Sequence, residues 1–374
     1  MAKLAILGAS YLQLPLVLKA RELGHTSICL AWEDGAVCQD YCDKYYPISI
    51  TNKEKVLEVC QKEKIDGITS IATDVAVPTM AYVARKLGLT GNSVRSSALT
   101  TNKFLMREAF AKNSLPIPGF RIIRTIDDLH TLEALSYPII IKPVDRSGSL
   151  GITMIQSKDQ LEDAVKYALE KSFTRQAIIE EFIEGKEISV ETISWEGKHY
   201  ILAYTDKVTS GYPHFVELEH HEPSILVSEE IRPTLNDLVA KSLDALEIEF
   251  GASHAEFIIN DRKEIFITEI GARMGGDFIG SDLVFLSTGY DFVKGVIDIS
   301  LCNFTDPNIY ENLFSGVFFL SDQSSYVSYF INNYIRFPEI VRTELTSNEE
   351  SKLTSSSNRN GYFIYQGNKK MNLL

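Results

Sequence analysis

The stretch of sequence that decides the fold runs from Ser253 to Phe278 and reads SHAEFIINDRKEIFITEIGARMGGDF. Two apolar runs flank the polar turn Asn260–Lys263, which is the pattern of a β-hairpin. Residues two apart share a face of a strand, so His254, Glu256 and Glu269 are expected to point the same way. Two carboxylates on one face of an apolar hairpin repel each other and lose hydration unless a cation lies between them. Hard oxygen ligands suit Mg²⁺, which makes Glu256 and Glu269 candidate metal ligands; a solvated polar face is the alternative.

Pairing across the turn gives the expected register of this hairpin. If Ile259 faces Glu264, then His254 lies opposite Glu269. Glu256 then stands in a diagonal relation to Glu269, with the two residues about 7 to 8 Å apart.

Composition narrows the class of protein. The 374 residues are 45% hydrophobic and 23% charged, which is typical of a folded enzyme with two or three lobes. The formal net charge is −13, and an acidic surface repels nucleic acid and anionic membranes. The N-terminal apolar run is too short for a signal peptide, and no run approaches a membrane span. We therefore expect no nucleic-acid partner and no membrane partner.

The cysteines indicate the compartment. There are five, an odd number, so a disulfide framework is not expected and a cytoplasmic location is favoured. Cys38 and Cys42 could form half of a metal site. Packing in the core is the preferred interpretation, because no second Cys or His pair stands at a fitting distance.

Residues 1–97 predict a doubly wound α/β domain, because strand and helix patterns alternate along them. GASYLQ after the first strand does not match G-x-G-x-x-G, so a dinucleotide site is not expected. Open sheets of this kind bind ligands at the carboxyl ends of their strands, which makes Ser10 and Asp74 candidate ligand residues. The expected strands lie at 3–10, 26–33 and 64–74, and the helices at 12–24 and 76–89.

Residues 98–302 change to an antiparallel α+β pattern. Thr100 or Thr101 is expected to open a helix that Pro116 and Pro118 end. A strand from about Phe304, the Ser- and Asn-rich stretch 347–360 and a last strand at 362–367 predict a small β-rich C-terminal subdomain over 303–374. The other expected elements are strands at 137–144, 152–157, 177–183 and 187–208, the last with a hairpin turn at Glu196 and Gly197, and helices at 157–172 and 229–246.

The loop DRSGSLG, Asp145–Gly151, follows Lys142 and joins two expected strands. It is not a P-loop, because it lacks G-x-x-x-x-G-K and does not lead into a helix. Its glycines and serines nevertheless supply backbone N–H and hydroxyl donors that can fold over phosphates, with the lysine supplying charge. A plain hairpin loop with a surface lysine is the alternative.

The segment IEEFIEGKEISV, Ile179–Val190, links two expected strands. In a cleft, free backbone groups of such a linker can bind an adenine edge, and Glu187 can accept hydrogen bonds from ribose hydroxyls. An exposed acidic turn is the alternative.

The ordered set of Lys103, Lys142, SGSLG, EEFIEG with Glu187, then Glu256, Glu269 and Arg273 resembles the ATP-grasp superfamily over about residues 1–300. Within it, the chain is similar to ADP-forming carboxylate–amine ligases of the L-amino-acid ligase kind. More distant similarity is to D-alanine:D-alanine ligase, phosphoribosylglycinamide synthetase and carbamoyl-phosphate synthetase. YPHFVELEHHEPS, Tyr212–Ser224, resembles the amino-acid ligase branch, where a histidine adjoins the substrate site and His221 is the matching position. SSSNRNGYFIYQGN, Ser355–Asn368, resembles the end of the small C-terminal domain of that branch.

The resemblance implies an ATP-grasp fold with ATP and Mg²⁺, or Mn²⁺, as cofactors. Lys103 and Lys142 would contact the phosphates, Glu187 the ribose, and Arg273 the transferring phosphoryl group. Glu256 and Glu269 would be metal ligands. The mobile phosphate-covering loop would be Ser147, Gly148, Ser149, Leu150 and Gly151, and the adenine would be held by Glu180, Glu181, Phe182 and Ile183.

Two positions depart from the family pattern. Many members carry an asparagine that adds a metal ligand where this chain has Gly271, so another oxygen, such as water, would be needed. Asn102 stands where an aspartate is common, and either residue caps the helix that follows.

The implied reaction joins a carboxylate to an amine. The γ-phosphate of MgATP would phosphorylate a small carboxylate, the amine would attack the acyl-phosphate, and ADP and phosphate would leave. Catalysis would rest on positioning and charge neutralisation by residues such as Lys142 and Arg273. His221 or His254 would take the proton of the incoming ammonium, although a structural role for His254 is equally open.

Substrate choice is expected in loops around Asp74, Glu217, His254, Gly275 and Gly276. The partners are then a small-molecule carboxylate and amine, with a homodimer as an expectation from the family. Two other functions remain open: ATP-grasp chemistry on an acid of nucleotide or carbamoyl metabolism, and a non-catalytic ATP-binding module.

Overall fold

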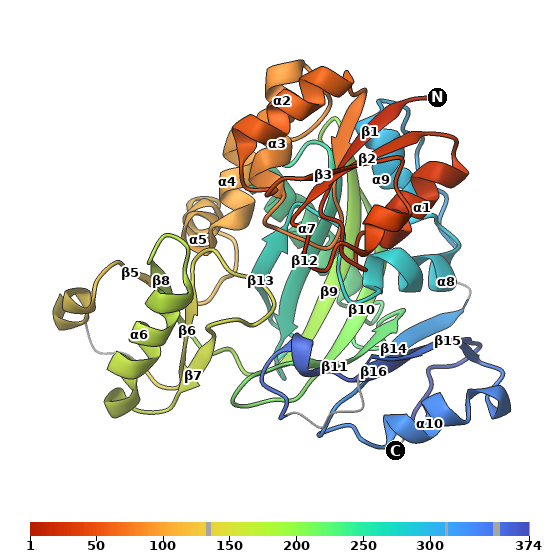
Figure 1. Ribbon diagram of the computed structural model, residues 1–374. Helices are drawn as coiled ribbons and strands as arrows, with labels where there is room; N and C mark the ends of the chain where they lie inside the picture. Colours follow the sequence, from red (N-terminus) through yellow and green to blue (C-terminus); the bar gives the residue numbers. More distant parts are fainter. Residues whose placement is uncertain (132–135, 311–312, 347–351, 374) are drawn as a thin grey trace.

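The computed structural model of the protein (Figure 1) describes residues 1–131, 136–310, 313–346 and 352–373. Part of the Ser- and Asn-rich stretch, 347–351, lies outside these ranges. The described chain forms three sheets, one parallel and two antiparallel, as the change of sequence pattern near residue 98 predicts. None of the helices in these ranges is long and apolar enough to cross a membrane.

The N-terminal region is a doubly wound parallel sheet, as predicted. Helices α1 and α9 cover one face and α2 and α3 the other, each with an apolar core against the sheet. Cys38 is fully buried and its Sγ donates to the carbonyl of Ser10 over 3.3 Å, which confirms the packing interpretation. In sheet order the strands are β3 (Lys44–Pro47), β2 (Thr26–Ala31), β1 (Lys3–Leu7) and β4 (Gly67–Thr69), and the helices are α1 (Leu14–Glu22), α2 (Lys53–Glu63), α3 (Val77–Leu87) and α9 (Phe292–Ser300).

Two helices, not one, cross from the first region to the second. Thr100 and Thr101 end α4 (Val94–Thr101), so the expectation that either opens the next helix is wrong. Helix α5 (Lys103–Lys112) begins after Asn102, whose side chain accepts from the N–H of Phe104 at 3.0 Å and of Leu105 at 3.1 Å. The predicted capping role of Asn102 is thus confirmed.

A four-stranded antiparallel sheet stands beside the large one (Figure 1). Helix α6 (Leu161–Lys171) packs its apolar face on this small sheet, with Val165 and Ala168 fully buried. In sheet order its strands are β5 (Phe120–Ile123), β8 (Ala177–Glu181), β6 (Ile139–Pro143) and β7 (Thr153–Ile155).

The large antiparallel sheet carries most of the candidate site. Its hairpin between β9 and β10 turns at Glu196 and Gly197, both with positive φ, as predicted. Strand β11 was not expected, because its charged sequence ELEHHE lacks an apolar alternation. In sheet order the strands are β13 (Ile265–Gly271), β12 (Gly251–Ile259), β9 (Lys186–Trp195), β10 (Lys198–Thr209), β11 (Glu217–Glu222), β14 (Phe314–Leu320), β16 (Gly361–Gly367) and β15 (Ile340–Leu345); the remaining helices are α7 (Arg232–Ala245), α8 (Val284–Thr288) and α10 (Val327–Asn332).

The C-terminal strands continue this large sheet. β14 pairs with β11 from the expected middle region, residues 98–302, for instance His221 with Gly316, and β16 and β15 follow. An apolar cluster including Phe318 and Phe363 packs α10 on this end of the sheet. Division of the chain at residues 97 and 302 into three domains therefore remains a proposal.

The register of the β12–β13 hairpin differs from the predicted one. Ile259 pairs with Ile265 rather than with Glu264, because the Asn260 side chain accepts from the backbone N–H groups of Arg262 and Glu264 and holds a turn one residue longer. A β-bulge then leaves an extra residue on β13. As a result Glu269 lies directly opposite Glu256.

Candidate active site

A cavity of about 600 Å³ lies between the small and the large sheet. Alternation along β9 and β12 creates one wall of the cavity. Ile188, Val190 and Phe257 face the core under α7, while Glu187, Glu256 and Ile258 line the cavity. Sequence-predicted residues that line it are Lys103, Lys142, Ser147, Gly148, Ser149, Glu180, Glu181, Phe182, Ile183, Glu187, Glu217, His254, Glu256, Glu269 and Arg273. Leu150, Gly151, Asp74, His221, Gly275 and Gly276 do not line it.

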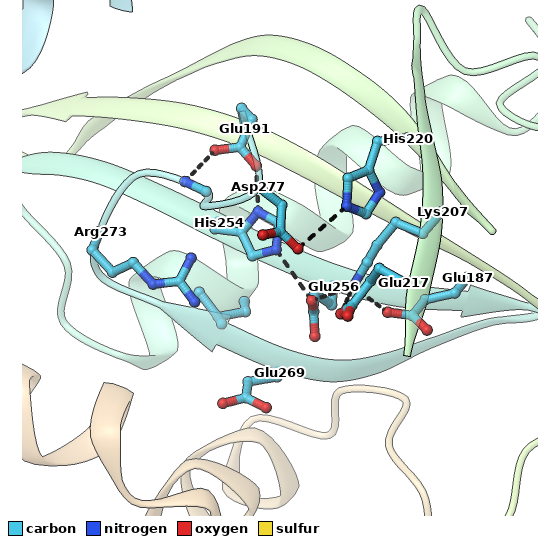
Figure 2. A network of polar contacts seen from close by, with 12 residues as sticks. Glu187, Glu191, Lys207, Glu217, His220, His254, Glu256, Glu269, Arg273 and Asp277 are labelled. Atoms are coloured by element: carbon cyan, nitrogen blue, oxygen red, sulfur yellow. Dashed lines mark hydrogen bonds and ion pairs between the residues drawn. The ribbon is translucent and has the colours of Figure 1, made fainter. Parts of the chain in front are cut away.

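Lys207 on β10 is the centre of the acidic wall (Figure 2). Its Nζ lies 2.5 Å from Glu187 Oε1, 2.5 Å from Glu256 Oε1 and 3.8 Å from Glu217 Oε1. Burial works against the ammonium charge, but the three carboxylates outweigh it and raise the pKa of Lys207 well above its ordinary value. One buried lysine thus contacts three acids of this wall.

Glu256 and Glu269 are suited to hold Mg²⁺. They lie directly opposite on neighbouring strands, which places their Cβ atoms about 5 Å apart, and both line the cavity. Each already meets a cation, Glu256 at Lys207 and Glu269 at Lys103 Nζ over 2.6 Å. In the described part of the chain, no three or more His, Cys, Asp and Glu side chains form a metal-binding group. Two carboxylates with water and phosphate oxygens in the other positions are the kind of ligand set that Mg²⁺ accepts.

Two lysines approach the cavity from other elements. Lys103, the first residue of α5, also donates from Nζ to the Arg146 carbonyl over 2.7 Å. Lys142 on β6 is buried and lies 2.6 Å from Glu180 Oε2, while Arg107 Nε lies 2.7 Å from the other oxygen of Glu180. Burial lowers the pKa of Lys142 against the opposing effect of Glu180. Burial alone would raise the pKa of Glu180, but Arg107 and Lys142 outweigh it and lower that pKa.

The loop Asp145–Gly151 is fixed at its base. The Asp145 carboxylate accepts from the backbone N–H groups of Phe173 at 3.1 Å and Thr174 at 2.8 Å. The guanidinium of Arg146 lies 3.5 Å from the ring centre of Phe173. Beyond this base Ser147, Gly148 and Ser149 line the cavity, the kind of lining that a phosphate-covering loop requires.

The linker Phe182–Gly185 connects the two sheets at the far end of the cavity. Phe182 and Phe215 approach with ring centres 6.1 Å apart. A Cβ on Gly185 would lie 2.5 Å from the carbonyl oxygen of Ile259, so only glycine lets the linker pass this closely to β12. Glu187, the predicted ribose ligand, follows the linker at the start of β9.

His254 is held by carboxylates on both sides. Its Nδ1 is hydrogen-bonded to the fully buried Glu191, and its Nε2 lies 3.1 Å from Glu256 Oε1. Burial disfavours the charged ring, but Glu191 and then Glu256 outweigh it and raise the pKa of His254 to about 9. These contacts favour the charged imidazole, whereas a base must be neutral, so they do not support the expected role of His254 as a base.

His221 is also misplaced for the role predicted from sequence. Neighbouring residues of a strand face opposite sides, and it is His220 that pairs with Lys207 on the cavity side. His221 is fully buried on the other side, with Nδ1 3.0 Å from the Tyr365 hydroxyl and Nε2 2.9 Å from Glu219 Oε2.

His220 is buried beside two acids of the site (Figure 2). Its Nε2 lies 3.9 Å from Asp277 Oδ2, and neither ring nitrogen has a hydrogen-bond partner among the residues that the structure describes. Burial lowers the pKa of His220. Arg359 holds Asp277 from behind with two contacts of 2.6 and 2.8 Å, which outweigh burial and lower the pKa of that carboxylate.

Arg273 is tied to the N-terminal region. Its Nε and Nη2 donate to the two oxygens of Asp74 over 2.9 and 3.1 Å, a bidentate pair that orients the guanidinium. A Cβ on Gly271 would lie only 2.7 Å from Asp74 Oδ1. The space that a side chain at position 271 would need is thus filled by the Asp74 carboxylate.

The predicted substrate residues Gly275 and Gly276 line a second cavity, of about 430 Å³. It lies between the N-terminal region and the C-terminal strands, with Tyr11, Phe278 and Arg342 among its walls. Gly275 touches the first site only through its backbone, where its N–H donates to Glu191 Oε2 over 3.0 Å.

Comparison with known proteins fits this geometry. A family model described as an ATP-grasp domain matches residues 135–282. The chain contains an ATP-grasp domain. That domain spans the phosphate-covering loop, the linker and the carboxylate hairpin, and so includes most of the residues that line the larger cavity.

The chain has relatives among ligases. Alanine–anticapsin ligase of Bacillus subtilis (strain 168) is 26% identical over 306 residues, which cover 75% of this chain and 63% of that protein. The chain therefore spans less than two thirds of the first relatives it matches. The crystal structure of L-amino acid ligase from Bacillus licheniformis superposes with a TM-score of 0.82 at 22% identity, covering 99% of this chain and 94% of that one. The biotin carboxylase domain dimer of Hydrogenobacter thermophilus 2-oxoglutarate carboxylase, in complex with MgADP, ADP and bicarbonate, gives a TM-score of 0.77 at 17% identity, covering 98% and 86%.

Several residues of this site were not predicted from the sequence. Lys207 and Glu191 could have been predicted, because each is a charged residue within an otherwise apolar strand and such residues are rarely buried without a partner. No sequence signal pointed to Arg107 or to Arg359, since each reaches the site from an element whose place depends on the tertiary fold.

Proposed function

We propose that this protein is an ATP-dependent carboxylate–amine ligase that activates a small carboxylate, an amino acid, as an acyl-phosphate and joins it to an amine. The observation that carries this proposal is one cavity in which Glu256 and Glu269 face three cations, Lys103, Lys207 and Arg273. The relatives support it, because alanine–anticapsin ligase and L-amino acid ligase are named for amide-forming activities.

We assign each part of ATP to a place in the cavity. The segment Glu180–Ile183 would hold the adenine and Glu187 the ribose, while Lys142 and the loop Ser147–Gly151 would contact the phosphates. Lys207 would be a further phosphate-binding cation. Glu256 and Glu269 would hold Mg²⁺, and Mn²⁺ could take the same oxygen ligands. The bound metal would neutralise charge on the transferring phosphoryl group.

The reaction needs no side-chain nucleophile. A substrate carboxylate oxygen bonds to the γ-phosphorus while the bond to the ADP oxygen breaks. The amine nitrogen then bonds to the acyl carbon, and phosphate leaves with the electron pair of the carbon–oxygen bond. Arg273, oriented by Asp74, would steady the phosphoryl group and the acyl-phosphate.

The incoming ammonium needs acids to bind it and a base to deprotonate it. Glu217 offers a carboxylate in the larger cavity and Asp277 one in the second cavity. His220 on β11 lies 3.9 Å from Asp277. Because burial lowers the pKa of His220 and its side chain is on the same side of the sheet as Lys207, we assign it rather than His221 or His254 as the proton acceptor. We further propose that the enzyme acts in the cytoplasm and forms a homodimer.

The first experiment measures ADP release with MgATP and amino acids offered singly and in pairs. Release that requires two substrates supports the ligase. Release with bicarbonate and no amino acid would instead favour a carboxyphosphate route, and nucleotide binding without turnover would favour a binding module.

The decisive variant is Glu269→Gln, with Glu264→Gln on the exposed turn of the same hairpin as its control. Loss of a metal-binding carboxylate is expected to lower kcat at least about 100-fold, or about 2.7 kcal/mol in transition-state stabilisation. Undiminished turnover in Glu269→Gln would show that the metal assignment is wrong.

A further inference from the structure

Glu191 has no role in the proposed reaction, yet it contacts both His254 and the loop at Gly275 (Figure 2). It lies on β9 and is fully buried. One carboxylate oxygen is hydrogen-bonded to His254 Nδ1 and the other accepts from the Gly275 N–H over 3.0 Å. We propose that Glu191 is a positioning residue. It fixes β12, which carries the proposed metal ligand Glu256, relative to the loop that contains Gly275 and Asp277. This inference rests on the proposed ligase function.

The first connection runs toward the metal site. A carboxylate on Nδ1 sets the orientation of an imidazole, so Glu191 directs His254 Nε2 at Glu256, 3.1 Å away. Glu256 also meets Lys207, which leaves its carboxylate with little freedom to rotate. Glu191 therefore restrains a metal ligand that it does not touch.

The second connection runs toward the proposed amine site. The Gly275 N–H is held by Glu191, and two residues later Asp277 turns toward His220 with a positive φ of 49°. A Cβ on Gly275 would lie 2.8 Å from Glu191 Oε1 and 2.9 Å from His254 Nδ1. The loop thus packs directly on the Glu191–His254 pair, and only glycine allows that approach.

Both connections run through the carboxylate of Glu191, so the position of Glu256 and the position of the Gly275 loop depend on each other. Acyl transfer requires the amine to reach the acyl carbon within about 3 to 3.5 Å, and small displacements lower the rate strongly. We infer that loss of Glu191 affects both phosphoryl transfer and use of the amine, although Glu191 touches neither substrate.

The test compares Glu191→Met with Glu222→Met. Both replace a fully buried glutamate of the large sheet. Among the described residues, the Glu222 carboxylate accepts from the hydroxyls of Thr205 and Ser287 rather than from His254 or Gly275. Glu191→Met is expected to lower kcat about 10- to 100-fold and to raise the KM of the amine, as loss of a residue that orients a metal ligand does. Glu191→Gln should recover most of the loss, because its amide can accept from Gly275 and donate to a neutral His254.

A second readout does not depend on turnover. MgADP should raise the Tm of wild type and Glu222→Met more than that of Glu191→Met, whereas ADP with EDTA should shift all three equally. The inference would be overturned if Glu191→Met had the kcat, the amine KM and the MgADP-induced Tm shift of the wild type. It would also be overturned if Glu222→Met lost as much as Glu191→Met. If Glu191→Met does not fold, Gly275→Ala carries the test, with an unchanged amine KM as the contradicting result. Absence of ADP release by the wild type would instead contradict the proposed function.

Discussion

Glu222 shows how a single buried acid makes stability depend on pH. Burial raises the pKa of its carboxyl group from 4.5 to about 8, so between these values the folded state keeps a proton that the unfolded state releases. The free energy of unfolding then falls by about 1.4 kcal/mol per pH unit from this group. Glu222→Gln keeps a neutral side chain of the same shape at every pH. Its Tm relative to wild type is expected to rise from about pH 5 to pH 8 in calorimetry, and a difference that is constant with pH would contradict this.

At the residue scale, the sequence predicted the shared face of Glu256, Glu269 and His254 correctly. It did not predict that Glu256 and Glu269 are direct neighbours, because the Asn260 side chain lengthens the turn and a bulge interrupts β13. Protonation states were also out of reach. The raised pKa of His254 comes from Glu191, which is distant in sequence.

At the scale of one element, the position of the loop Asp145–Gly151, which we propose covers the phosphates, depends on how its last glycine is packed. Gly151 has a φ of +82°, and a Cβ there would lie 2.7 Å from Pro143 Cγ and 3.0 Å from Lys171 Cβ. Gly197 has a φ of +77° with open space around it, so Gly197→Ala is a control for backbone strain alone. Both alanine variants should lose roughly 1 kcal/mol of stability.

Only Gly151→Ala should also raise the KM of ATP, because the loop must shift away from Pro143 to make room. Steady-state kinetics with varied ATP tests this expectation. An equal KM in Gly151→Ala and Gly197→Ala would show that packing at Gly151 does not position the loop.

Elements with strong periodicity were predictable, and charged ones were not. The parallel sheet of the N-terminal region, α6 and the β9–β10 hairpin appear as expected. Strand β11 was missed because its sequence, ELEHHE, consists mainly of ionisable residues. These residues form hydrogen bonds with residues of other strands, as Glu222 does with the Thr205 hydroxyl. The local sequence does not predict such contacts.

At the scale of the whole molecule, the C-terminal strands β14, β16 and β15 should unfold together with strands β9 to β13, because they belong to one sheet. Phe363 on β16 is fully buried and stacks on Phe318 with ring centres 5.0 Å apart. Phe363→Ala is expected to cost about 3 to 5 kcal/mol.

Fluorescence of Trp195 at the end of β9 reports on the other part of the same sheet, and Trp32→Phe removes the second tryptophan. In that background Phe363→Ala should lower the Tm seen by Trp195. A Trp195 transition that stays unchanged would mean that the C-terminal strands fold as an independent unit.

Gly271 and Asp74 occupy one volume from two regions of the chain, since any side chain at position 271 would overlap the carboxylate of Asp74. The two positions are therefore expected to covary. A relative with asparagine at the position of Gly271 should carry a residue smaller than aspartate at the position of Asp74, and its arginine would then lack the bidentate partner found here. A protein in which only one of the two residues has changed would pack poorly at this point. The two positions are therefore expected to change together in evolution.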